Sequence, residues 1–129
     1  MVGRMANIPQ FEFTVNSEKD LAALTLRNYK RQLNKITKIS YLENEKDTSY
    51  PVVLNKQDLL RYSSYVTNLI RENITNRQML CVTYSAIFYA LGRQDFTKDP
   101  RGEIYTLEFR KVYYSDEYKE KLRKDGKFV

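Results

Sequence analysis

Residues 75–92 read TNRQMLCVTYSAIFYALG, and this stretch decides the fold class of the chain. Thr75 followed by Gln78 forms a capping box, which predicts the start of a helix. Gly92 comes directly after the last apolar residue and suits the position that ends a helix. Between them the apolar residues point to nearly every side, so we expect the other helices to pack around this central one. They are Met79, Leu80, Val82, Tyr84, Ala86, Ile87, Phe88, Ala90 and Leu91.

A long amphipathic helix is predicted earlier in the chain, from Ser17 to Ile39. Ser17 and Asp20 make a capping pair. Apolar residues then recur at spacings of three and four, which is typical of one buried stripe. The stripe consists of Ala22, Leu26, Tyr29, Leu33 and Ile36.

Residues 40–54 separate this helix from the next and predict a connection. They are polar from Glu43 to Ser49, and Pro51 blocks helix continuation. A second helix is expected to start near Asn55, a good N-cap, and to end near Asn73. Its buried stripe would consist of Leu59, Tyr62, Val66, Leu69 and Ile70, with Asp58 in the first turn.

The two ends of the chain show weaker patterns. Within residues 1–16, Phe11, Phe13 and Val15 alternate with polar residues, which predicts an extended arm lying on the domain or on a partner. Residues 99–102 predict a turn. Residues 103–114 fit either a strand or a helix. We favour the helix, because a lone strand would have only the N-terminal arm to pair with. Residues 115–117 would cap a last charged helix that ends before Gly126.

The length of 129 residues fits one domain, so residues 17–129 are predicted to form a single all-α bundle of four to five helices. Cys81 is the only cysteine, which excludes an internal disulfide and a thiolate metal cluster, and its apolar neighbours predict a buried structural thiol. The chain has no histidine, and thus lacks the usual general base and the commonest metal ligand. We therefore expect no enzymatic activity, no metal and no cofactor.

The sequence also bears on where the protein works. We find no signal peptide and no apolar run of the ~20 residues that span a membrane. The expected location is intracellular, in the nucleus or the cytoplasm, or alternatively inside an assembled virion.

Positive charge is concentrated in one part of the first helix. The chain has 22 Lys and Arg against 16 Asp and Glu, a net charge of +6. Residues 26–40 hold five basic side chains and no acidic one. Four of the five fall on the face opposite the buried stripe, and Lys30 lies at its flank. Because a solvated face normally mixes signs, we predict an anion-binding surface. The four residues are Arg27, Arg31, Lys35 and Lys38.

The order of these helices resembles a known family. The segments LTLRNYKRQLNKI (residues 24–36), LNKQDLLRYSSYV (54–66) and TNRQMLCVTYSAIFYALG (75–92) are similar to the N-terminal core-binding domain of tyrosine recombinases and phage-type integrases. The resemblance covers about residues 20–92 and implies a SAM-like helical bundle that binds DNA mainly through phosphates. That family cuts and rejoins strands with a separate catalytic domain, which needs a histidine-containing motif. The resemblance therefore extends to the binding half alone.

Two functions follow as hypotheses. In the first, the basic face contacts DNA phosphates, with Lys30, Lys56, Arg61 and Arg77 as flanking contacts. In the second, the chain is a structural or assembly protein, for example a minor component of a large virus particle. Its protein partners would then bind the N-terminal arm and the aromatic C-terminal region, since tyrosine is favoured where protein surfaces meet. The aromatic residues of that region are Tyr105, Phe109, Tyr113, Tyr114 and Tyr118.

Overall fold

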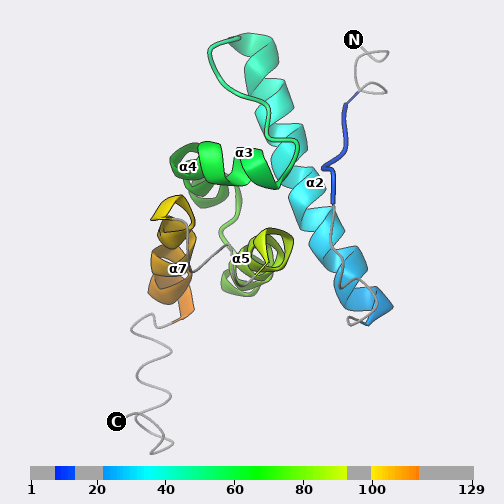
Figure 1. Cartoon of the computed structure of the whole chain (residues 1–129), viewed down its shortest axis with the longest axis vertical. Coiled ribbons are helices and arrows are strands. Elements are labelled where there is room, and N and C mark those ends of the chain that lie inside the picture. Colours follow the sequence, from blue (N-terminus) through cyan, green and yellow to red (C-terminus); the bar gives the residue numbers. More distant parts are fainter. Residues whose placement is uncertain (1–7, 14–21, 93–99, 114–129) are drawn as a thin grey trace, which may run out of the picture.

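The computed structural model describes residues 8–13, 22–92 and 100–113, and within these ranges it contains five helices and no strand (Figure 1). This confirms the predicted all-α bundle. The helices are α2 (Ala23–Lys46), α3 (Lys56–Arg61), α4 (Ser63–Asn73), α5 (Arg77–Leu91) and α7 (Pro100–Tyr113).

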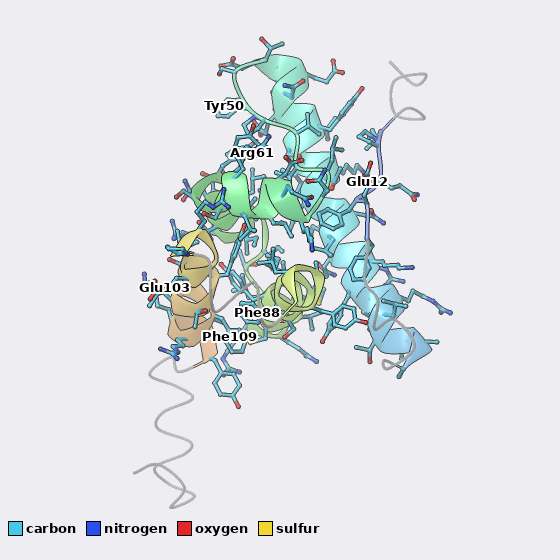
Figure 2. The ribbon with its side chains drawn as sticks, viewed as in Figure 1. Glu12, Tyr50, Arg61, Phe88, Glu103 and Phe109 are labelled. Carbon is cyan, nitrogen blue, oxygen red and sulfur yellow. The ribbon has the colours of Figure 1, made fainter. Side chains whose placement is uncertain are left out.

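The core forms where α5 meets its neighbours. Helix α5 packs against α2 on one side, against α7 on the other and also against α3 (Figure 1). Ala86 and Ile87 are fully buried there, and the rings of Phe88 and Phe109 meet edge to face between α5 and α7 (Figure 2). The predicted central position of this helix is thus confirmed. Its first turn is nevertheless exposed to solvent, and Met79 is 36% exposed.

The ends of α5 follow local chemistry. The helix is capped by Asn76, whose side-chain oxygen accepts a hydrogen bond from the Met79 N–H at 3.1 Å. The predicted Thr75 capping box is therefore wrong by one residue, because asparagine supplies the stronger N-cap. Gly92 ends the helix with a φ of 73°, a backbone conformation that glycine adopts without strain, as predicted.

Helix α2 extends to Lys46, so the prediction of a connection starting at residue 40 is wrong. Residues 40–46 contain neither glycine nor proline. The side chain of Ser40 is buried and bonded, donating to the Thr37 carbonyl at 2.9 Å and accepting from the Val53 N–H at 2.9 Å. This contact holds the start of the added segment, residues 40–46, against residues 51–54. The helix starts at Ala23, and the predicted capping pair, Ser17 and Asp20, lies outside the described residues.

The buried side of α2 largely matches the predicted stripe. Leu33 and Ile36 are buried, and Leu26 and Tyr29 are partly buried. Ala22 is exposed because it lies just before the first helical residue, so its place in the stripe was wrong.

The predicted second helix is two helices, α3 and α4, which meet at Tyr62 (φ −115°, ψ 36°). Its predicted start is confirmed, since the Asn55 side chain accepts from the Asp58 N–H at 3.0 Å. The Leu59 carbonyl, which lies where the ladder of helical hydrogen bonds is interrupted, accepts from the buried Tyr105 hydroxyl of α7. A side chain that enters the ladder in this way is a recognised cause of a helix break.

The open choice for residues 103–114 is settled as helix through Tyr113. Tyr105 is fully buried and Phe109 and Val112 pack on the core, whereas Leu107 is 50% exposed, which is the pattern of a helical stripe. The predicted turn at residues 99–102 is wrong for residues 100–102, because Pro100 is the first residue of α7. Proline suits that position, since its missing N–H would have no partner within the helix. The predicted cap at residues 115–117 lies outside the described residues, as does the charged helix after it.

The described part of the N-terminal arm, residues 8–13, runs without helical structure beside α2 (Figure 1). The Phe11 N–H donates to Asn34 Oδ1 at 2.7 Å, and the Glu12 N–H donates to the Leu54 carbonyl at 2.7 Å. Phe11 is buried, Phe13 partly buried and Glu12 exposed, so the predicted alternation is confirmed for these three. The rest of the arm, including Thr14 and Val15, lies outside the described residues.

Candidate functional site

The outer face of α2 gathers the four basic residues that the sequence predicted. Arg27, Arg31, Lys35 and Lys38 are all exposed, whereas Ile36 on the opposite side is buried. At 100° per residue the four lie within an arc of roughly 80°, and they extend over about 16 Å of the helix axis. We call these four residues the basic row.

The basic row lies in a stretch of α2 that contains no acidic residue. Among the residues that the structure describes, no carboxylate forms an ion pair with any of the four. Residues 26–40 contain no Asp or Glu, and Glu45 is the first carboxylate beyond the row on the same side of α2. Four cations on one helix face, with no described carboxylate paired to them, make a surface that attracts anions.

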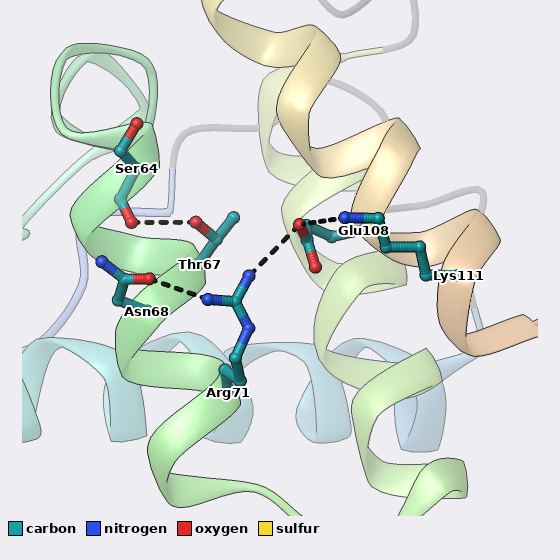
Figure 3. A network of polar contacts seen from close by, with 6 residues as sticks. All are labelled: Ser64, Thr67, Asn68, Arg71, Glu108 and Lys111. Atoms are coloured by element: carbon teal, nitrogen blue, oxygen red, sulfur yellow. Dashed lines mark hydrogen bonds and ion pairs between the residues drawn. The ribbon is translucent and has the colours of Figure 1, made fainter.

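Two cations on α4 and α7 pair with a carboxylate. Arg71 of α4 lies 3.2 Å from Glu108 Oε1 of α7, and Lys111 lies 3.3 Å from the same oxygen (Figure 3). Arg71 also donates to Asn68 Oδ1 at 3.0 Å. This network joins α4 to α7, and each of its two cations has a described carboxylate partner, which the residues of the basic row lack.

Lys30 lies at the flank of the row, as predicted, but it is only partly exposed. Its ammonium nitrogen is 5.8 Å from the centre of the Phe13 ring, a cation–π distance. The Phe13 ring also stacks on Tyr89 of α5, with ring centres 5.7 Å apart. Lys30 therefore helps to hold the arm on the bundle.

The three other predicted contacts come from different helices. Lys56 is the first residue of α3 and is partly buried. Arg61, at the end of α3, is exposed and lies 3.9 Å from Asp58 and 5.8 Å from the Tyr62 ring centre (Figure 2). Arg77, in the first turn of α5, donates from Nε to the Val112 carbonyl at 3.2 Å and from an NH2 group to the Tyr113 carbonyl at 2.9 Å. The structure thus brings together the basic row with Lys30 beside it, and places these three elsewhere.

Two buried phenols have strongly raised pKa values. Burial raises the pKa of Tyr84 to about 12, with a further rise from Glu108 that Arg71 partly offsets. Burial also raises the pKa of Tyr105 well above its ordinary value. Both phenols therefore keep their protons at alkaline pH values at which an exposed tyrosine ionises. In the described ranges no group of three or more His, Cys, Asp or Glu residues could hold a metal ion, and Cys81 is a partly buried free thiol. No helix of the same ranges is long and apolar enough to cross a membrane.

Sequence reasoning missed two exposed leucines on the outer face of α2. Leu24 is 63% exposed and Leu42 is 37% exposed. Helical geometry places both within the arc of the basic row, one before its first cation and one after its last. Leu42 was not predicted to lie on this face because residues 40–54 were interpreted as a connection. A helical projection drawn over the full length of α2 would have revealed both.

Comparison of the chain with protein-family models, with curated proteins and with solved structures found no match. The resemblance to the core-binding domain of tyrosine recombinases therefore stays a prediction.

Proposed function

We propose that this chain is a non-catalytic DNA-binding module that contacts phosphates through the basic row of α2. The observation that carries the proposal is the row itself, which consists of four exposed cations on one rigid helix with no described carboxylate paired to them. The predicted resemblance to the recombinase core-binding domain supports the same function.

The chemistry of the row suits a phosphate backbone. Arg27 and Arg31 carry planar guanidinium groups that bind phosphate oxygens in pairs, and Lys35 and Lys38 act as point charges. Contacts of this kind neutralise phosphates and release counterions, which gives affinity that falls steeply with salt. They carry no direct sequence information, so we expect little preference among duplexes of different sequence.

The experiment that tests the proposal compares two matched variants. Arg31→Gln/Lys35→Gln removes two charges from the row, and Lys46→Gln/Arg110→Gln removes two exposed charges from outside it. Binding to a short labelled duplex is measured by fluorescence anisotropy across a salt series, with folding checked by circular dichroism. Because the net charge of the two variants is the same, any difference between them reports position rather than overall charge.

We expect the first variant to lose at least about tenfold in affinity at low salt and the second to bind almost as well as the parent chain. Equal weakening of the two variants would show that binding does not depend on the position of the charges, which would overturn the assignment to the basic row. A well-folded parent chain that fails to bind the duplex would overturn the function.

A structural or assembly role is the second candidate. The aromatic residues that suggested it are packed within the domain where the structure describes them. Phe11 is buried in the core, and Phe109 contacts Phe88 on one side and Tyr113 on the other. Tyr114 and Tyr118 lie outside the described residues. The observation that favours a protein partner is instead the pair of exposed leucines on α2.

A further inference from the structure

The outer face of α2 carries an apolar residue at each end and cations between them. Leu24 and Leu42 are two of the five exposed large apolar residues in the described part of the chain. They are 18 residues apart, or about 27 Å along the helix axis. Phosphate binding uses the cations and gives no reason for an exposed leucine at either end.

We propose that this face also docks an acidic amphipathic helix of another protein, which competes with nucleic acid for α2. Carboxylates in the middle of that helix would pair with Arg31, Lys35 and Lys38, and an apolar residue near each of its ends would cover Leu24 or Leu42. Complementary charge across an interface selects the partner and fixes its register, and the leucines would add apolar contact at both ends.

The spacing of the row favours a helix as the occupant. Leu24, Arg31 and Lys38 recur at intervals of seven residues, and Lys35 and Leu42 are also seven apart. Two helices that pack at a shallow crossing angle contact each other along lines of this period, with axes 8–10 Å apart. A partner helix of about five turns could therefore follow the whole face from Leu24 to Leu42.

A second copy of this chain does not fit the face. Two α2 helices packed through their outer faces would set four cations against four cations in either orientation. Like charges placed together across an interface cost several kcal/mol. The partner must supply negative charge, which the row itself lacks.

The described residues leave this face open. The arm binds α2 through Asn34 and packs against Lys30, so it lies beside the basic row. Leu24, Arg27, Arg31, Lys35, Lys38 and Leu42 all stay exposed with the arm in place. Docking would therefore require no displacement of the described residues.

The test uses two synthetic helical peptides of about 25 residues with identical charge. Both carry glutamates in their central turns. One has leucines near both ends on the same face, and the control has serines at those positions. Binding of each labelled peptide is measured by anisotropy against the parent chain and against Leu24→Ser/Leu42→Ser. Competition with a labelled duplex is measured in parallel.

We expect the leucine peptide to bind the parent chain about tenfold or more tightly than the serine peptide, since burial of apolar surface adds to charge pairing. That advantage should disappear in Leu24→Ser/Leu42→Ser, whose duplex affinity should not change. Amide chemical shifts should move along the outer face of α2, and the leucine peptide should displace the duplex.

Equal binding of the two peptides would overturn the inference, as would an advantage that persists in Leu24→Ser/Leu42→Ser or shifts that fall on α5 and α7. The proposed function is judged separately. A chain that binds the duplex but not the leucine peptide keeps the DNA site and loses the helix partner. A chain that binds the leucine peptide but not the duplex keeps the helix partner and loses the DNA site.

Discussion

Arg77, in the first turn of α5, donates a hydrogen bond to the carbonyl oxygen of Tyr113, the last residue of α7, at 2.9 Å. Its Nε also donates to the Val112 carbonyl at 3.2 Å, and its guanidinium carbon lies 6.0 Å from the centre of the Tyr113 ring. The carbonyls at the end of a helix carry partial negative charge and lack helical partners. Arg77 therefore fastens the start of one helix to the end of another.

This contact predicts that Arg77 matters for stability and not for DNA binding. Arg77→Ala should lower the free energy of unfolding by about 1 kcal/mol, because it removes two partly solvated hydrogen bonds and a ring contact. Urea unfolding measures the loss, and duplex affinity should stay within about twofold of the parent chain. If Arg77→Ala were as stable as the parent and bound the duplex weakly, Arg77 would belong to the DNA interface.

Ser40 gives a second prediction about stability. Its buried hydroxyl accepts from the Val53 N–H and donates to the Thr37 carbonyl, while the Thr37 hydroxyl donates to the Val53 carbonyl at 2.6 Å. Ser40→Ala would leave the buried Val53 N–H without its acceptor, at a cost of about 1–3 kcal/mol in urea unfolding.

The matched control is Ser64→Ala, at an exposed position in the first turn of α4. A surface change of this kind should alter stability by less than about 0.5 kcal/mol. Similar losses in the two variants would argue that the Ser40 contact does not hold α2 against residues 51–54.

Alkaline pH should destabilise the fold through its buried phenols. The pKa of Tyr84 is raised from 10.0 to about 12, chiefly by burial, so the folded state keeps its proton where the unfolded chain loses it. The stabilisation is fully present below pH 10 and is lost as the pH rises through about 12. Tyr105 shifts in the same direction.

The variant that isolates this effect is Tyr84→Phe. Between about pH 9 and pH 11, a range that spans the ordinary tyrosine pKa, its urea midpoint should fall less steeply than that of the parent chain. Some alkaline loss should persist because Tyr105 is unchanged. Parallel curves for the two proteins would contradict the assignment to Tyr84.

Local sequence signals predicted the parts of the fold that local chemistry controls. The Asn55 cap, the Gly92 terminus and the basic row each depend on residues within one helix, so periodicity and capping preferences were enough. The helical period of α2 alone predicted the four exposed cations of the site.

Distant contacts account for what the sequence did not reveal. The extension of α2 past Ile39 depends on Ser40 meeting Val53, and the break at Tyr62 lies beside the carbonyl that Tyr105 reaches across 46 residues. The role of Arg77 likewise depends on carbonyls 35 and 36 residues away. No single-helix pattern encodes such pairings, so Arg77 was expected among the DNA contacts.

The geometry of the row also predicts how binding responds to salt. If Arg27, Arg31, Lys35 and Lys38 each neutralise one phosphate, the slope of log affinity against log salt concentration should be about −3.6 on duplex DNA. Lys35→Gln should make the slope shallower by about 0.9. Lys30→Gln should change it much less, because the Lys30 ammonium lies over the Phe13 ring. Anisotropy titrations at several salt concentrations give all three slopes. An equal change from Lys30→Gln would mean that Lys30 contacts DNA as a fifth cation, and that the arm moves to release it.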